Sequence, residues 1–138
     1  MSETVSLDFE LKSPITRVWN ALTDSATLSQ WTFFETNDFR AVVGHRFQFR
    51  GKPGAGGVVV DCEVLEVDEP HRLAYTWVVA AHQHHTRVTW TLAEAENGVT
   101  RLHLEQSGFA SGATQEIGGA KYGWTAMLGQ LQTVLSAQ

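Results

Sequence analysis

The chain opens with a strict alternation of apolar and polar residues. Across residues 4–13, Val5, Leu7, Phe9 and Leu11 fall on one side and polar side chains fall on the other. Because side chains alternate between the two faces of a strand, this period of two predicts a strand with one buried face.

The pattern then changes to helical spacing for two short stretches. Apolar residues recur three and four apart over residues 14–22, directly after Ser13-Pro14, which predicts a helix that begins there. A second short helix is predicted over residues 25–31, with Asp24 or Ser25 as its N-cap.

Six further stretches return to the strand period. The Gly-rich residues 52–57 between them predict a surface loop, and Asn97-Gly98 predicts a tight hairpin turn. The alternation slips between Val64 and Leu65, which predicts a bulge. The expected strands are 38–43 and 45–51, as a hairpin about Gly44, followed by 58–70, 71–80, 85–95 and 99–108.

The last segment, residues 114–138, is predicted to be one helix with an apolar stripe that includes Trp124 and Leu131. Gly118, Gly119 and Gly123 lie early in it, and each glycine costs a helix interior about 1 kcal/mol against alanine. Two interpretations follow: the backbone there approaches another group closely, or the helix begins later than its pattern suggests.

These elements predict an α+β fold: a curved antiparallel sheet of about seven strands around a long C-terminal helix, with two short helices after the first strand. No linker or repeat divides the chain, so residues 1–138 are expected to form a single domain.

Composition narrows the function classes. The chain is 43% hydrophobic and 18% charged with a net charge of −5, and it has no basic block, so a nucleic-acid partner is not expected. It also shows neither a signal peptide nor an apolar run of the roughly 20 residues that span a bilayer, so we expect a soluble cytoplasmic protein without a membrane partner.

Cys62 is the single cysteine, in a strand pattern without a cationic neighbour in sequence. A buried and unreactive thiol is therefore expected.

Several motifs in order along the chain resemble a known family. They are "RVWNALTD", "LSQW", "EVLEVDEPHRLAYTW", "TRVTWTLAEAENGVTRLHLEQSGF" and "GW" followed by "MLGQL". Together they resemble the START-like (SRPBCC, helix-grip) superfamily and, within it, the bacterial domains related to the activator of the heat-shock protein 90 ATPase. Residues 39–49 and 118–124 depart from the family pattern, so the identity of a ligand is not carried over.

The resemblance implies a cavity between the C-terminal helix and the curved sheet, lined by the inward strand faces. Its aromatic residues suit a flat or elongated apolar molecule with a few polar groups. The expected ligand-binding residues are Trp31, His45, Phe47, Phe49, Tyr75, Trp77, Trp90, Leu104, Gln106, Phe109, Trp124 and Met127. The alternative interpretation is that these side chains pack against one another as an ordinary core.

Polar residues at inward positions are the candidates for chemistry. His45, Tyr75 and Gln106 each either bond to the protein or reach a ligand, because buried polar groups need partners. "HQHH" over residues 82–85 has histidines but too few converging ligands for a metal, so solvated turn histidines are expected. No catalytic residues, metal or cofactor are predicted.

Three functions remain open. The first is a binding protein for a small hydrophobic or aromatic ligand, with homodimer formation left open. The second is a cyclase-like or hydrolase-like enzyme that acts on a hydrophobic substrate in the same cavity, with His45, Tyr75 and Gln106 as its polar groups. The third is a chaperone co-regulator, which receives the least support because the eukaryotic activator has a separate N-terminal domain for which these 138 residues leave no room.

Overall fold

One curved antiparallel sheet and three α-helices make up the part of the chain that the structure describes. The computed structural model describes residues 2–51, 58–79 and 84–137. The strands are β1 (Ser2–Leu11), β2 (Thr36–Asn37), β3 (Arg46–Arg50), β4 (Val59–Asp68), β5 (Arg72–Val79), β6 (His84–Glu94) and β7 (Thr100–Ala110). The helices are α1 (Ile15–Thr23), α2 (Ser25–Trp31) and α3 (Thr114–Ser136). The predicted α+β fold with a long C-terminal helix is confirmed.

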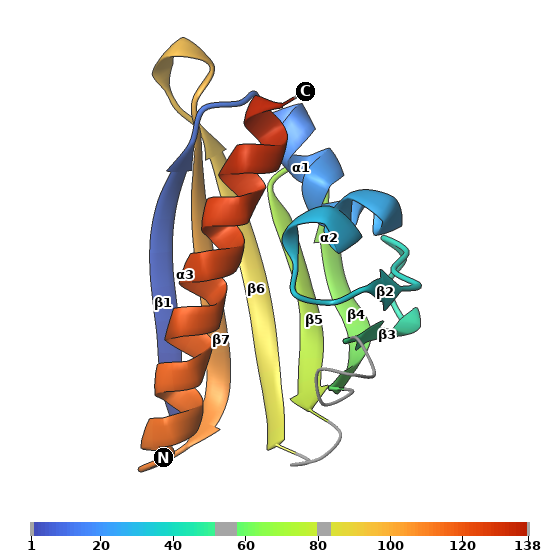
Figure 1. Ribbon diagram of the computed structural model, residues 1–138, viewed down its shortest axis with the longest axis vertical. Coiled ribbons are helices and arrows are strands. Elements are labelled where there is room, and N and C mark those ends of the chain that lie inside the picture. Colours follow the sequence, from blue (N-terminus) through green and yellow to red (C-terminus); the bar gives the residue numbers. More distant parts are fainter. Residues whose placement is uncertain (1, 52–57, 80–83, 138) are drawn as a thin grey trace.

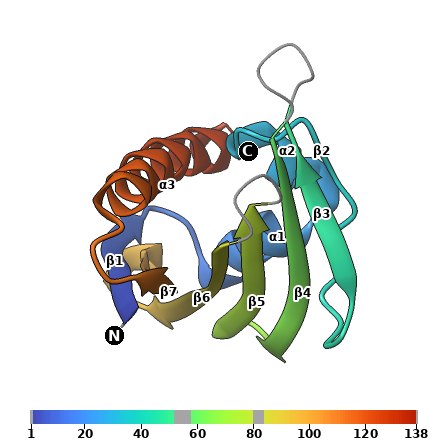
Figure 2. The same cartoon turned by 90° about the horizontal axis from the view of Figure 1, so that it is seen from below.

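The sheet is a meander that returns to its first strand. Its strands lie in the order β1-β7-β6-β5-β4-β3-β2, and each neighbouring pair is antiparallel. Strands β2 to β7 neighbour one another in chain order, whereas β1 pairs with β7 along its length, from Ser2 opposite Ala110 to Leu11 opposite Thr100. The sheet curves, and α3 lies across its concave face (Figures 1 and 2).

The two short helices lie beside the C-terminal end of α3 (Figure 1). The Arg17 guanidinium of α1 donates to the carbonyl of Leu135 at 3.4 Å, and the Lys12 backbone N–H donates to Gln132 Oε1 at 3.0 Å. The N-terminal half of α3 extends beyond α1 and α2 along the sheet (Figure 1). Among the described residues no helix combines the length and the apolarity needed to cross a bilayer.

The inward strand faces follow the predicted alternation. Leu73, Tyr75 and Trp77 on β5 are buried, and so are alternate residues on β6 and β7. The Trp31 and Trp90 rings meet edge to face in the centre, with centroids 6.0 Å apart and planes at 87°. Their indole N–H groups donate to the Ala21 carbonyl and to Tyr75 Oη, both at 2.9 Å, so these large rings are buried with their polar atoms satisfied.

The strand predicted over residues 38–43 is wrong. The second strand is only Thr36–Asn37, opposite Arg50 and Phe49, and residues 38–45 form an irregular connection with a turn at Gly44, whose φ is +90°. Asp38 Oδ1 accepts the Gln48 backbone N–H at 2.9 Å, a donor that a continuing strand would have used. After Asn37, a hydrogen bond to the Asp38 side chain therefore replaces the backbone hydrogen bond of a continuing strand.

Two other local predictions are confirmed. The pairing of β4 with β5 shifts register between Val64 and Glu66, which places the bulge at Leu65 as predicted. The β6–β7 connection turns at Asn97 and Gly98, with φ values of +61° and +72°. Both residue types tolerate positive φ, which explains why this dipeptide marks the turn.

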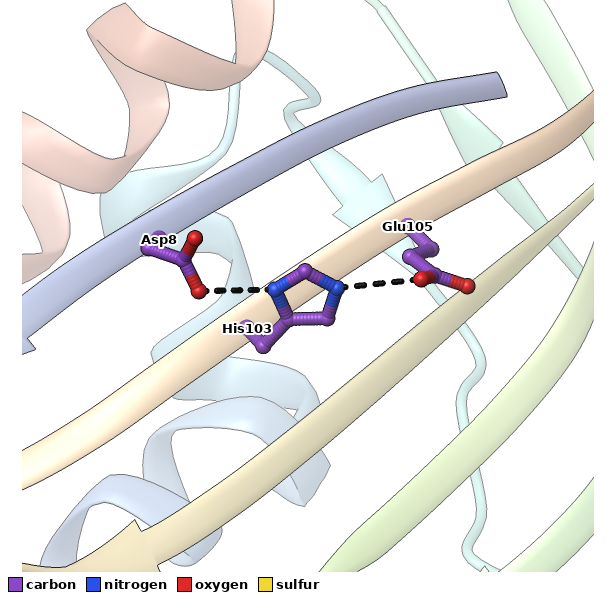
Figure 3. A network of polar contacts seen from close by, with 3 residues as sticks. All are labelled: Asp8, His103 and Glu105. Atoms are coloured by element: carbon purple, nitrogen blue, oxygen red, sulfur yellow. Dashed lines mark hydrogen bonds and ion pairs between the residues drawn. The ribbon is translucent and has the colours of Figure 1, made fainter. Parts of the chain in front are cut away.

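On the outer face of the sheet, His103 of β7 is held between two carboxylates (Figure 3). Its Nδ1 lies 2.8 Å from Asp8 Oδ1 on β1, and its Nε2 lies 3.1 Å from Glu105 Oε1. These hydrogen bonds raise the pKa of His103 above its usual value, the bond to Asp8 most, because they favour the protonated ring. The imidazole therefore links the edge strand β1 to β7.

Cys62 is buried on β4, with 5% of its surface exposed, as predicted. Burial raises the pKa of the Cys62 thiol far above its usual range, and the carboxylates of Asp61 and Asp38 raise it further. The thiol therefore stays protonated, and the thiolate that reacts with electrophiles does not form in the folded chain.

We expect Cys62 of the folded protein to resist 5,5′-dithiobis(2-nitrobenzoate) at pH 8 and to react only when denaturant unfolds the chain. A Cys62→Ser, Val43→Cys variant is the control, because Val43 is 62% exposed and a cysteine in its place should react at once. Equal rates for the two native proteins would contradict the burial.

We expect His103→Gln to destabilise the protein below about pH 6 and to lose that effect at higher pH. The folded-state pKa is raised above the ordinary value of about 6.5, so the stabilisation is fully present below the unfolded pKa and disappears as pH rises through the folded pKa. The effect stays under about 1 kcal/mol, since solvent screens these side chains.

Urea unfolding of both proteins at a series of pH values measures this difference. Asp8→Asn, which removes the partner at 2.8 Å, should reduce the same pH dependence. A difference between wild type and His103→Gln that does not change with pH would show that the imidazole acts without its charge.

Candidate functional site

The candidate site is a cavity of about 460 Å³ between the N-terminal half of α3 and the ends of β5, β6 and β7. It lies where α3 extends past α1 and α2, so the concave face there is covered by one helix alone (Figure 1). The lining residues are Trp77, Val79, Thr86, Gln106, Phe109, Gln115, Glu116, Gly119, Ala120, Gly123, Trp124 and Met127.

Small residues on α3 give this cavity its space. Gly119, Ala120 and Gly123 line it, and a Cβ added at Gly119 or Gly123 would meet no heavy atom within 4 Å. Both interpretations drawn from the glycines are therefore wrong: among the residues that the structure describes, no group lies within 4 Å of a Cβ placed at any of the three glycines, and α3 begins at Thr114, before all of them. The missing side chains leave room on the helix side of the cavity.

Tryptophan rings form the inner wall. The Trp77 and Trp124 centroids are 5.0 Å apart, and Trp90 meets Trp124 edge to face at 5.4 Å. Trp77 also contacts Phe49 at 5.5 Å, which joins the wall to the aromatic core behind it. Each of these rings therefore packs against at least one other aromatic ring, and such pairs stabilise by about 0.5–1.5 kcal/mol each.

A chain of three buried hydrogen bonds crosses the same wall. Trp124 Nε1 donates to Gln106 Oε1 at 2.8 Å, and Gln106 Nε2 donates to Thr86 Oγ1 at 2.9 Å. The Thr86 hydroxyl donates in turn to the carbonyl of Trp77 at 2.7 Å. The chain ties α3 to three strands and places an amide and a hydroxyl in an otherwise aromatic surface.

Five of the predicted ligand-binding residues line the cavity: Trp77, Gln106, Phe109, Trp124 and Met127. Six others are buried in the core behind or beside it, namely Trp31, Phe47, Phe49, Tyr75, Trp90 and Leu104. Phe47 and Tyr75, for example, pack edge to face with centroids 5.4 Å apart. Ligand contact by any of the twelve residues stays a prediction.

The three polar candidates are not brought together. His45, the twelfth predicted residue, lies outside the cavity lining, and its Nε2 is 2.8 Å from the Asp38 carbonyl. Tyr75 is buried beside Trp90, and burial raises the pKa of its hydroxyl far above the usual value. Of the three, Gln106 alone lines the cavity, and Glu116 is the ionisable side chain among the described lining residues.

The histidine-rich stretch is described only in part. His82 and Gln83 lie outside the described residues, His84 begins β6, and His85 is exposed. Among the residues that the structure describes, no three His, Cys, Asp or Glu side chains are grouped as a metal site.

Sequence reasoning missed seven of the lining residues, although the pattern carried signals for most of them. Thr86 continues the inward alternation of Val88 and Trp90, and Val79 continues that of Trp77. On α3, residues 116, 120, 123 and 127 recur at spacings of three and four, so extending the apolar face toward its start would have found them. The residues concerned are Val79, Thr86, Gln115, Glu116, Gly119, Ala120 and Gly123.

Comparison with known proteins places the chain among similar sequences and structures. Residues 12–136 match the family model described as activator of Hsp90 ATPase homolog 1-like protein. The search of curated proteins found no match.

Solved structures resemble the chain over nearly its whole length. Protein MLL2253 from Mesorhizobium loti is 36% identical, with a TM-score of 0.90 over 99% of this chain and 98% of that one. Protein CV1439 from Chromobacterium violaceum is 25% identical, with a TM-score of 0.81 over 96% and 97%. DynU16, a protein in the dynemicin biosynthetic locus, is 25% identical with a TM-score of 0.82; 96% of this chain aligns with 47% of DynU16, about half its length.

We expect Thr86→Val to destabilise the protein by about 1–3 kcal/mol, because it removes the acceptor of Gln106 and the donor to Trp77 while keeping the side-chain shape. Thr89→Val on the same strand is the matched control: Thr89 is also buried, at 9% exposed, but its hydroxyl makes no hydrogen bond within the described residues, so the free energy of unfolding should change by less than about 0.5 kcal/mol. Urea unfolding measures both. Equal effects would show that the hydrogen-bond chain does not stabilise the wall.

Proposed function

The chain belongs to the family of activator of Hsp90 ATPase homolog 1-like proteins, and from this premise and the geometry of the cavity we propose that it binds a small hydrophobic or aromatic molecule. The ligand lies between the glycine-rich face of α3 and the aromatic wall of β5 and β7. The five predicted residues that line the cavity make the contacts, namely Trp77, Gln106, Phe109, Trp124 and Met127.

The cavity itself is the observation that carries the proposal. Its volume of about 460 Å³ falls within the range of roughly 300–1,000 Å³ that is usual for sites of small molecules. Such sites have mostly apolar walls with a few placed polar groups, and here the lining combines the rings of Trp77, Phe109 and Trp124 with the polar side chains of Gln106 and Thr86.

The position of the cavity favours a ligand over a packing defect. Enlarging the side chains of α3 would close it at no steric cost, since Gly119 and Gly123 have open space where a Cβ would lie. Glycine also costs a helix interior about 1 kcal/mol at each position. Glycine at Gly119 and Gly123 leaves this volume open beside the aromatic wall, which supports occupation by another molecule.

The similarity to DynU16 supports a small-molecule ligand. That protein belongs to a biosynthetic locus, and it is 25% identical to this chain over the aligned part. Because this chain spans about half of DynU16, the similarity covers one fold unit and not the activity of the larger protein.

We expect Gly123→Leu to weaken ligand binding by roughly tenfold or more, because the new side chain occupies the cavity. N-phenyl-1-naphthylamine, an uncharged dye that fluoresces in apolar sites, serves as the probe. Its fluorescence is titrated with the wild-type and variant proteins, and native mass spectrometry of the freshly purified wild type reveals any molecule that copurifies.

The matched control is Gly118→Leu. Gly118 lies in the same helix, also has open space at its Cβ position, and is not part of the cavity lining. Both substitutions raise helix propensity equally, so a difference in dye binding reports the cavity alone. Unchanged binding by Gly123→Leu, or no binding by the wild type, would contradict the proposed site.

A further inference from the structure

The hydrogen bonds in the cavity wall can run in one direction only. The indole N–H of Trp124 can donate and cannot accept, so the Gln106 atom 2.8 Å away must be the amide oxygen. At the other end the Trp77 carbonyl can only accept, so the Thr86 hydroxyl gives it its proton. The Gln106 amide is thereby held in one orientation, with its nitrogen toward Thr86.

One polar hydrogen of this amide is left over. The Gln106 nitrogen carries two hydrogens, and one of them is bonded to Thr86 Oγ1. Within the described part of the chain the second hydrogen has no protein acceptor, although the side chain is only 3% exposed. A buried donor without an acceptor is costly, whereas an unused lone pair on Oε1 or Oγ1 costs less. Since Gln106 lines the cavity, an occupant of the cavity can supply the missing acceptor.

We propose that Gln106 determines the ligand class by donating its free amide hydrogen to an uncharged acceptor oxygen, such as a carbonyl, on an otherwise apolar ligand. The inference rests on the proposed binding function. Gln106 thus selects by the direction of its hydrogen bond, and a ligand of the same shape without an acceptor leaves the donor unpaired.

Charge at the cavity mouth favours a neutral acceptor over a carboxylate. Glu116 lines the mouth from the first turn of α3, where its negative charge offsets the positive end of the helix dipole. The described lining contains no Lys or Arg that would pair with an anionic ligand. Burying an unpaired carboxylate is costly, so the site disfavours it.

Three naphthalenes of equal size test the proposal. 2-Acetylnaphthalene carries a neutral carbonyl, 2-isopropylnaphthalene carries no acceptor, and 2-naphthoate is anionic, while all three have the same number of non-hydrogen atoms. We expect the ketone to displace N-phenyl-1-naphthylamine at a concentration about tenfold lower than the other two compounds. Gln106→Met should remove the preference of the ketone over the hydrocarbon, and Gln130→Met, elsewhere on α3, should keep it.

A second measurement does not depend on folding of the variant. In ¹H–¹⁵N spectra of the wild type, the ketone should shift one side-chain amide proton of Gln106 downfield, and the hydrocarbon should not.

Glu116→Gln tests the effect of charge at the cavity. It should reduce the difference in affinity between the ketone and the carboxylate by about two- to fivefold.

The outcomes separate this inference from the proposed function. Binding of ketone and hydrocarbon with equal affinity, or no movement of the Gln106 amide signals, overturns the inference and leaves the binding function intact. Tightest binding by 2-naphthoate overturns the preference for a neutral acceptor. Binding of none of the compounds, including the dye, overturns the binding function as well.

Discussion

The burial of one face of α3 in the concave side of the sheet is the interaction on which the rest of the structure depends. Trp124, Met127, Leu128, Leu131 and Leu135 are all buried along that face. The helix has 23 residues, and α1 and α2 lie only beside its C-terminal end. Full apolar contact at that end holds the helix in place, so its N-terminal half can carry glycines and border a cavity. The closely packed core and the cavity thus lie along the two halves of the same helix, α3.

The chemistry of the cavity follows from the same arrangement. Trp124 connects α3 to the sheet by two kinds of contact. The centroid of its ring lies 5.0 Å from that of Trp77, and its indole N–H donates a hydrogen bond to Gln106 Oε1 at 2.8 Å. Packing and hydrogen bonding therefore both fix the orientation of the Trp124 indole. Through its hydrogen bond, the indole in turn fixes the orientation of the Gln106 amide. A wall made only of hydrocarbon side chains would hold a ligand by shape, whereas this wall also offers one oriented donor.

The fold could be predicted from the sequence because apolar residues recur every second residue in the strands and every three to four residues in the helices. Nearly every inward position on β5, β6 and β7 is buried as predicted. The prediction was wrong at residues 38–43, where Val42 and Val43 are 60% and 62% exposed, Phe39 is buried and Ala41 packs partly buried against the core. The site was predictable only in part. Periodicity tells which rings face inward, but Trp31 and Trp90 fill their space by touching each other, while Trp77 and Phe109 border a cavity. That difference depends on side chains from distant segments, above all on the glycines of α3.

The pairing of β1 with β7 has a consequence for the order in which the chain can acquire its structure. Neighbours from β2 to β7 form hairpins or short meander connections, whereas Ser2 must find Ala110 across almost the whole length of the chain. During synthesis β1 has no partner until β7 has been made, and the loop closure that joins them is entropically costly. Long-range pairing of this kind slows folding toward milliseconds to seconds. Until then the apolar residues of β1 stay open to contact by other molecules, and an unpaired strand edge of this kind is prone to aggregation.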